Sequence, residues 1–316
     1  MRYRQLGDSD LRVSEICLGT WTTFGESVGD DVAATLVEAA FDAGINFFDT
    51  SNNYGVPAGR AEEALGRALA DRPRDSYIVA TKVCGEMPNG DRGLSRGQIL
   101  KQIDASLARL QLDHVDLYQC HRSYQDVPLE ETLGALTEVV DAGKVRFVGV
   151  SNWNGEQIRR AVELAREHGF AKIVSSQLQY SLLRRDAEQD VIPASRENGI
   201  SQIPWSPLAQ GVLTGKYRPG ESFADETRAA ARGDGFMSQY LGDDVLERVE
   251  RLGPIAGGLG ITLAQLALAW LLQEPNVTSP IVGASRPEQV RDNAAASEVR
   301  LDDETMRAIE DALAPM

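Results

Sequence analysis

One stretch of the chain joins a short apolar run to an acid and a phenol, and it reads Phe47-Phe48-Asp49-Thr50-Ser51-Asn52-Asn53-Tyr54-Gly55. The apolar residues before Asp49 predict a short buried strand that ends at this carboxylate. The polar residues that follow are typical of a loop. An acid and a phenol at the mouth of a sheet are unusual for a structural turn. The ends of the other strands are therefore where their partners are expected.

This stretch belongs to a regular alternation of strands and helices. Eight short apolar runs are predicted as strands, at residues 16–18, 47–49, 77–81, 115–120, 145–150, 173–176, 200–204 and 279–282. Helical patterns separate these runs. Such alternation implies right-handed crossovers and a parallel sheet, and eight units in about 300 residues fit a (β/α)8 TIM barrel.

An N-terminal hairpin and extra helices are expected beside the barrel, and residues 1–316 are predicted to form one domain. Residues 2–6 and 11–14 flank a polar turn and predict the β-hairpin. A doubly wound sheet is the alternative, disfavoured because no Gly-x-Gly-x-x-Gly follows the first strand. Residues 208–242 are expected to form an elongated loop. Ser95–Gln98 and Ser285–Glu288 carry the capping-box pattern of a helix start.

The composition narrows the class of function. The chain has 316 residues, is 42% hydrophobic and carries a formal net charge of -15. This charge disfavours nucleic-acid binding, which draws on lysine and arginine. The three cysteines and three histidines show neither a disulfide framework nor metal-ligand spacing. No signal-peptide pattern and no apolar run of about 18 residues occurs, so we expect a cytoplasmic protein without a membrane span.

Three ionisable residues stand at the ends of consecutive predicted strands: Asp49, Lys82 and His121. In a (β/α)8 barrel the carboxyl ends of the strands meet at one rim, so these side chains and Tyr54 are expected to lie together. An ammonium beside the phenol is expected to lower the pKa of Tyr54, which is about 10 when unperturbed. Asp49 would keep Lys82 charged and oriented, and His121 would supply a second hydrogen bond.

This set predicts a proton donor placed over a carbonyl oxygen. A carbonyl that takes a proton must also receive an electron pair at carbon. A hydride from a reduced nicotinamide cofactor is the natural partner, since no metal site or nucleophilic cysteine is evident.

The same residues make the chain resemble an aldo-keto reductase over nearly its whole length. The stretches that carry the resemblance are Asp49-Thr50 with Tyr54-Gly55, Thr81-Lys82, Leu117–His121, Gly143-Lys144 with Gly149–Asn152, Trp205–Leu208, and Gly283–Ser285 with Gln289 and Asn293. Gly93–Arg96 and His121-Arg122 resemble the bacterial and potassium-channel β-subunit-like branch more than the aldose reductase branch.

The resemblance implies a role for each matching position. The catalytic tetrad would be Asp49, Tyr54, Lys82 and His121, with Tyr54 as the general acid. The implied cofactor residues are Gly19, Thr20, Trp21, Asp49, Ser151, Asn152, Gln177, Trp205, Ser206, Pro207, Leu208, Gly211, Lys216, Gly283, Ser285, Arg286, Gln289 and Asn293. Substrate contacts are expected from Trp21, Tyr54, His121, Arg122 and Trp153.

Within the cofactor set, three residues would hold the nicotinamide carboxamide: Ser151, Asn152 and Gln177. Trp205 would stack on the nicotinamide ring. The pyrophosphate would lie along Ser206, Leu208 and Gly211 with Lys216 nearby, and the adenosine half along Gly283, Ser285, Arg286, Gln289 and Asn293.

One departure from the family pattern bears on the cofactor. In the aldose reductase branch an arginine stands at the position of Gln289 and a lysine at that of Gly283, and both favour the 2′-phosphate of NADP. Here Ser285 and Arg286 are left to bind it. Because arginine suits phosphate geometry, we favour NADPH over NADH.

Several alternatives stay open at this stage. A cofactor-sensing regulatory or binding subunit is the second function, because the resemblance includes channel β subunits. Trp205 can be core, and Trp21 and Trp153 can be loop packing. The carbonyl substrate and the oligomeric state are not predicted, because the pocket depends on loops around residues 21, 87–92, 122–127 and 208–242.

Overall fold

A computed structural model describes residues 1–123, 126–220 and 237–314. Its main sheet has eight parallel strands in the order β10-β3-β4-β5-β6-β7-β8-β9. The strands are β3 (Cys17–Gly19), β4 (Phe47–Asp49), β5 (Ile78–Val83), β6 (Val115–Cys120), β7 (Val145–Ser151), β8 (Ile173–Gln177), β9 (Ser201–Gln202) and β10 (Ile281–Val282). All the named strand pairs are parallel, as the alternation predicted.

The sheet curls until its two outer strands meet. Isolated parallel bridges join Gln202 to Val277 and Trp205 to Ile281. The backbone N–H of Ile281 donates to the carbonyl of Pro204 at 2.8 Å. These contacts connect β9 to β10, so the predicted (β/α)8 barrel is confirmed and the doubly wound alternative is wrong.

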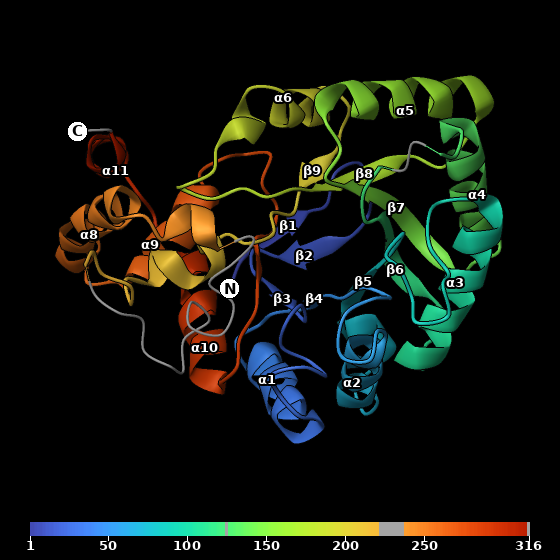
Figure 1. Cartoon of the computed structure of the whole chain (residues 1–316), viewed down its shortest axis with the longest axis horizontal. Helices are drawn as coiled ribbons and strands as arrows, with labels where there is room; N and C mark the ends of the chain where they lie inside the picture. Colours follow the sequence, from blue (N-terminus) through green and yellow to red (C-terminus); the bar gives the residue numbers. More distant parts are fainter. Residues whose placement is uncertain (124–125, 221–236, 315–316) are drawn as a thin grey trace.

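Helices follow the strands around the outside of the sheet, as Figure 1 shows. They are α1 (Asp30–Asp42), α2 (Arg60–Leu69), α3 (Arg96–Leu110), α4 (Leu129–Asp141), α5 (Gly155–His168), α6 (Val191–Arg196), α8 (Asp243–Gly258), α9 (Leu263–Leu271), α10 (Pro287–Ala295) and α11 (Asp303–Leu313). Each buries an apolar stripe against the strands or a neighbouring helix, which is why the helical periodicity was readable in the sequence.

The predicted N-terminal hairpin forms from β1 (Tyr3–Gln5) and β2 (Arg12–Ser14), which pair antiparallel. Its apolar side chains Leu6, Leu11 and Val13 are fully or almost fully buried. They share a core cluster with residues of the barrel strands, among them Phe47 and Leu117. The hairpin thus fills the N-terminal end of the barrel interior.

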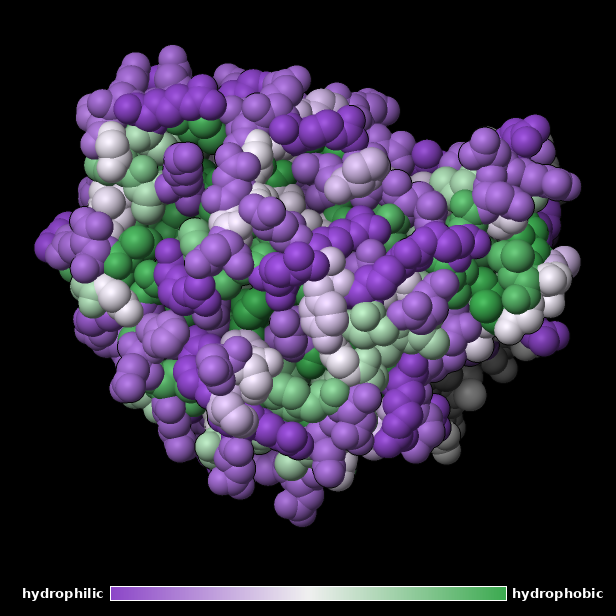
Figure 2. All heavy atoms as spheres, turned by 180° about the vertical axis from the view of Figure 1, so that it is seen from behind, coloured by the Kyte–Doolittle hydropathy of each residue, from purple (hydrophilic) through white to green (hydrophobic). Residues whose placement is uncertain are grey.

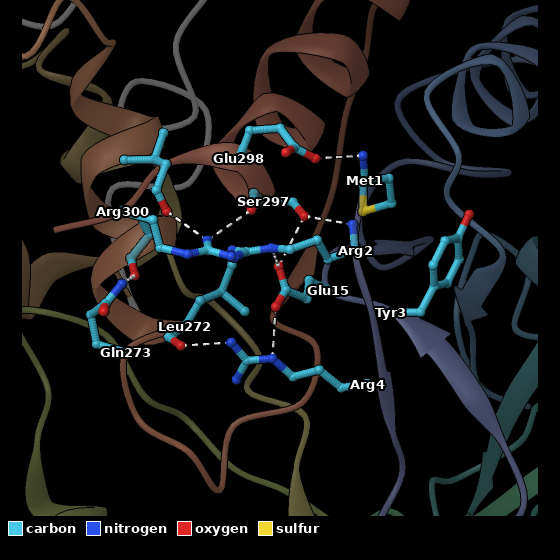
Figure 3. A network of polar contacts seen from close by, with 12 residues as sticks. Met1, Arg2, Tyr3, Arg4, Glu15, Leu272, Gln273, Ser297, Glu298 and Arg300 are labelled. Carbon is cyan, nitrogen blue, oxygen red and sulfur yellow. Dashed lines mark hydrogen bonds and ion pairs between the residues drawn. The ribbon is translucent and has the colours of Figure 1, made fainter.

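A polar network ties this hairpin to the C-terminal part of the chain (Figure 3). Glu15 is 3% exposed and accepts hydrogen bonds from Arg2 at 2.9 Å, from Arg4 at 2.7 Å and from the hydroxyl of Ser297 at 2.9 Å. The Arg4 guanidinium also donates to the carbonyls of Leu272 and Val277. Each charge in this network has a partner, as buried ions require.

Several local predictions need correction. Both capping boxes are wrong: Ser95 makes no side-chain cap to α3, and α10 begins at Pro287 after Arg286. The strand expected at residues 200–204 is only β9, because Pro204 has no N–H for a longer ladder. Of the expected loop at residues 208–242, η3 (Ala209–Thr214) is a 3-10 helix, and residues 221–236 lie outside the described residues.

The surface is mostly polar. Figure 2 shows hydrophilic residues over most of one face, with hydrophobic ones in the recesses between them. In the part of the chain that the structure describes, no single helix has the length and apolar composition to cross a membrane. The pair α8 and α9, bent by 92°, reaches that length and composition only when taken together.

Candidate active site

The barrel brings the four residues of the expected tetrad to the carboxyl ends of consecutive strands. Asp49 is the last residue of β4, Lys82 is the second-to-last residue of β5 and His121 directly follows β6. Tyr54 stands on the loop between β4 and α2, and its carbonyl accepts the backbone N–H groups of Gly59 and Ala61. This loop is therefore anchored at the start of α2.

Asp49 and Lys82 form a buried ion pair. The Lys82 Nζ lies 2.6 Å from Asp49 Oδ1, and the side chains are 0% and 4% exposed. The ammonium also donates to the Thr50 carbonyl at 2.7 Å. Asp49 Oδ2 accepts from Gln177 Nε2 at 2.9 Å and from Gln119 Nε2 at 3.4 Å. Three further groups thus hold the pair in one geometry, as a buried charge pair needs.

Tyr54 lies directly over this pair. The Lys82 Nζ is 4.8 Å from the centre of the phenol ring, and the Tyr54 hydroxyl oxygen is 3.3 Å from His121 Nε2. Burial raises the pKa of Tyr54, and the lowering effect of Lys82 does not offset it. The expectation of a lowered pKa is therefore wrong, because the desolvation of the phenolate outweighs the attraction of the ammonium.

The charge states of Lys82 and His121 also follow from the balance between burial and nearby charges. Burial lowers the pKa of Lys82, but Asp49 and then Tyr54 raise it, and the pKa ends above its usual value. Burial and the nearby Lys82 lower the pKa of His121 to about 3. At neutral pH Lys82 is therefore an ammonium, Tyr54 a protonated phenol and His121 a neutral imidazole.

A second group of residues surrounds the tetrad on the next strands. Asn152 has a left-handed backbone with φ 57°, and its Nδ2 donates to the carbonyl of His121 at 3.1 Å and to Ser151 Oγ at 3.0 Å. The Trp205 indole N–H donates to Asn152 Oδ1 at 3.1 Å. The Trp21 ring lies 6.0 Å from that of Trp205 and 6.4 Å from that of Tyr54.

These contacts bring Trp21, Ser151, Asn152, Gln177 and Trp205 together around Tyr54. The Trp205 ring contacts the Asn152 amide and lies edge-on to the Trp21 ring, and aromatic faces beside hydroxyl and amide groups suit a flat heteroaromatic ring with a carboxamide. The donor set therefore fits the nicotinamide half of the expected cofactor.

The segment after β9 has an unusual backbone. Ser206, Ala209 and Gln210 all have a positive φ, of 52°, 47° and 58°. The Gln210 amide contacts the Ser206 hydroxyl. A Cβ on Gly211 would lie 3.5 Å from Lys216 Nζ, so the exposed ammonium of Lys216 is close to this backbone. Such non-glycine conformations occur at functional sites, and the nearby cation suits a phosphate.

The residues expected at the adenosine half gather around the start of α10. Ser285 and Arg286 are exposed just before Pro287, and Asn293 is buried within α10. The Ser285 N–H donates to Gln289 Oε1 at 2.8 Å. Gly283 lies beside the loop after β3, because a Cβ there would stand 4.0 Å from the Trp21 carbonyl. The whole predicted set therefore follows the rim from β3 to β10.

The remaining predicted residues differ in how close they lie to the tetrad and in how exposed they are. Thr20 donates from its hydroxyl to that of Thr50 at 2.8 Å, next to the ion pair. Gly19 has a packing reason for its lack of a side chain, since a Cβ would lie 2.5 Å from Ile281 Cγ2. Trp153 is 4% exposed and belongs to the core cluster, while Arg122 is exposed beside His121. Contact of Trp153 with substrate stays a prediction.

Comparison with known proteins decides the family. The model of the aldo/keto reductase family matches residues 15–314. This chain belongs to the aldo/keto reductase family. It is 40% identical over 304 residues to a probable voltage-gated potassium channel subunit beta of Oryza sativa subsp. japonica, covering 95% of this chain and 92% of that protein.

Two further relatives of this aldo/keto reductase have similar coverage. A probable voltage-gated potassium channel subunit beta of Arabidopsis thaliana is 40% identical, again over 95% and 92% of the two chains. The protein named uncharacterized oxidoreductase YrpG of Bacillus subtilis (strain 168) is 38% identical, over 98% and 95%. The chain is thus an oxidoreductase of the aldo-keto reductase kind, a family that uses nicotinamide cofactors and acts on small carbonyl compounds.

Sequence reasoning missed residues that support the tetrad of this aldo/keto reductase. Gln119 is the β6 register partner of Lys82 and contacts Asp49, and Ser51 contacts His121 Nδ1 at 3.1 Å. A polar glutamine near the carboxyl end of this predicted strand was a signal for the first. Ser51 had no signal, because His121 follows a different strand, 70 residues further along the chain.

Other charged clusters are structural. A cavity of about 550 Å³ opens at the opposite, N-terminal end of the barrel and is lined by Arg74, Asp116 and Arg146, among others. There Asp116 pairs with Arg74 at 2.6 Å and with Arg146 at 3.0 Å. Among residues 1–123, 126–220 and 237–314, no group of three or more His, Cys, Asp or Glu side chains is placed to hold a metal ion.

Proposed function

We propose that this chain is an NADPH-dependent reductase that converts aldehydes or ketones to alcohols reversibly, with Tyr54 as the general acid. One observation carries the proposal: the Tyr54 hydroxyl stands 3.3 Å from a neutral imidazole and its ring lies 4.8 Å from the Lys82 ammonium. A reduced nicotinamide held by these residues would supply the hydride that the carbonyl carbon takes up. Tyr54 supplies the proton that the carbonyl oxygen takes up.

The raised pKa of Tyr54 suits a proton donor. Because burial disfavours the phenolate, Tyr54 keeps its proton at neutral pH until a carbonyl oxygen can accept it. The phenolate that forms then lies beside the Lys82 ammonium, and its charge is stabilised where it develops. Asp49 keeps that ammonium charged and fixed, so no reorientation is needed during the reaction.

Tyr54→Phe tests the acid. We expect turnover of a carbonyl panel with NADPH to fall about 10²- to 10⁴-fold, the range for general acid catalysis. The dissociation constant of NADPH should change little, because only a hydroxyl is removed. Tyr3→Phe is the matched control, since Tyr3 donates to Gly44 at the far end of the barrel. Turnover by Tyr54→Phe close to the parent value would refute the role.

The proposed preference for NADPH rests on Arg286. Its exposed guanidinium immediately precedes α10, whose N-terminal backbone N–H groups also favour an anion. Arg286→Ala should weaken NADPH binding about 10-fold and leave NADH binding nearly unchanged, because a charge-assisted contact is worth about 1.5–3 kcal/mol. Parallel titrations of both cofactors measure this. Arg291→Ala, also exposed on α10, is the control; equal losses for NADPH and NADH would contradict the preference.

A second candidate function is a regulatory subunit that senses the nicotinamide cofactor with little turnover. Two relatives at 40% identity are named as channel β subunits, which favours it. The complete set Asp49, Tyr54, Lys82 and His121 favours the enzyme. A panel of aldehydes and ketones separates the two, because tight cofactor binding without turnover on any member would support the regulatory subunit.

A further inference from the structure

Ser51 is fully buried, and its hydroxyl lies beside His121. Ser51 Oγ lies 3.1 Å from His121 Nδ1, 2.8 Å from Asn53 Oδ1 and 3.3 Å from Asn52 Oδ1. A serine hydroxyl has one hydrogen to donate and two lone pairs. Where that hydrogen points therefore decides whether Nδ1 of His121 carries a proton.

A chain of hydrogen bonds leads from Ser51 to a group whose direction is unambiguous. Asn52 Nδ2 donates to Gln102 Oε1 at 3.1 Å, and Gln102 Nε2 donates to Asp91 Oδ2 at 3.2 Å. Hydrogen bonds from Lys101 and Gln98 lower the pKa of Asp91 to about 2, so its carboxylate is ionised. An ionised carboxylate only accepts hydrogen bonds.

The direction of each amide in this chain follows from that carboxylate. Gln102 must present its NH2 to Asp91, so its carbonyl faces Asn52. Asn52 must then present its NH2 to Gln102, so its carbonyl faces Ser51. The Ser51 hydrogen points toward the acceptors Asn52 Oδ1 and Asn53 Oδ1, and a lone pair of Ser51 Oγ faces His121 Nδ1. Nδ1 is consequently the nitrogen that donates.

We propose that Ser51 is a positioning residue, held by the chain Asp91–Gln102–Asn52, that fixes His121 as the tautomer with its proton on Nδ1. Nε2 then has only a lone pair and accepts the Tyr54 hydroxyl across 3.3 Å. The lowered pKa of His121 agrees with a single proton on the ring. An arriving carbonyl oxygen takes the Tyr54 hydrogen bond in place of Nε2.

The tautomer can be measured without any substrate. Two-bond 1H–15N correlation spectra of the protein labelled with [15N]histidine separate a protonated from an unprotonated ring nitrogen. The chain has three histidines, and His114→Gln and His168→Gln leave only the signals of His121. We expect a protonated Nδ1 and an unprotonated Nε2 near pH 7.5. A proton on Nε2 in the parent protein would overturn the proposal.

Variants test the chain of hydrogen bonds that leads from Asp91 to Ser51. Ser51→Ala should let the other tautomer populate, and Gln102→Met should do so to a smaller extent because it acts two links away. Ser9→Ala is the matched control: this buried hydroxyl donates to the Leu6 carbonyl near the barrel floor. An unchanged His121 spectrum in folded Ser51→Ala would refute the role of Ser51.

The kinetic consequence rests on the proposed reductase function, whereas the tautomer does not. Ser51→Ala should lower kcat about 3- to 10-fold, as the loss of one buried hydrogen bond predicts, with the KM for NADPH unchanged. The expected tautomer in a protein without turnover would count against the proposed function alone. A proton on Nε2 in an active reductase would count against this inference alone.

Discussion

The two ends of the barrel interior are built from the same strands and differ completely in chemistry. On β4, Phe47 belongs to the apolar cluster under the hairpin, and Asp49 belongs to the ion pair. On β6, Leu117 belongs to that cluster and Gln119 contacts Asp49. Residues two apart point to the same face of a strand. One step of the pleat therefore separates the part that holds the barrel together from the part that carries the candidate chemistry.

The difference also explains the electrostatics of the site. The apolar cluster under the hairpin keeps water from reaching the Asp49–Lys82 pair from the N-terminal end of the barrel. Each charge therefore depends on the other and on fixed dipoles. The same burial from solvent raises the pKa of Tyr54 and lowers that of His121. Substitutions at the two ends should consequently separate stability from turnover.

The largest effect is expected for Lys82→Met, which leaves Asp49 as a buried charge without its partner. The free energy of unfolding in urea should fall by about 3–5 kcal/mol, and turnover by about 10²- to 10³-fold, as for the loss of one electrostatic stabiliser. The double variant Lys82→Met/Asp49→Leu is the control. It should regain most of the stability and none of the turnover; a single variant as stable as the parent would contradict the account of the pair.

Leu117→Ala should produce the opposite pattern. A cavity at the apolar floor should lower the free energy of unfolding by about 2–5 kcal/mol, while kcat of the remaining folded protein changes little. Gln119→Leu, two residues along the same strand, is its matched partner. It should change stability by less and lower kcat about 2- to 10-fold through the weaker hold on Asp49. A loss of kcat in Leu117→Ala larger than in Gln119→Leu would break the comparison.

A smaller effect is expected in the pH dependence of stability. The pKa of His121 is about 3 in the folded protein and about 6.5 when unperturbed. Between these values the unfolded chain binds the extra proton, so His121 makes the folded protein more stable as pH rises. The slope is at most about 1.4 kcal/mol per pH unit. Urea unfolding at about pH 4 to 6 measures it, and the slope should be shallower in His121→Asn; equal slopes would contradict the neutral imidazole.

The sequence predicted those parts of the site that depend on strand ends. Asp49, Lys82 and His121 could be placed because parallel strands end at one rim, and the positions of Trp205 and Arg286 followed from the family resemblance. The direction of the Tyr54 pKa was wrong, because it depends on how much solvent the surrounding elements exclude. The chain of hydrogen bonds from Asp91 to Ser51 could not be predicted from the sequence, because its members come from three elements whose side chains meet only in the folded protein.

The network around Glu15 has a consequence for the order in which the protein folds. Glu15 bonds Ser297 across a sequence separation of 282 residues, and β3 pairs with β10 near the other end of the chain. During synthesis the first hairpin leaves the ribosome long before these partners exist. The middle strands can pair in sequence as they emerge, because each lies next to its predecessor. The floor of the barrel is thus sealed only when the last helices have been made, and until then its apolar residues depend on partial packing or chaperones.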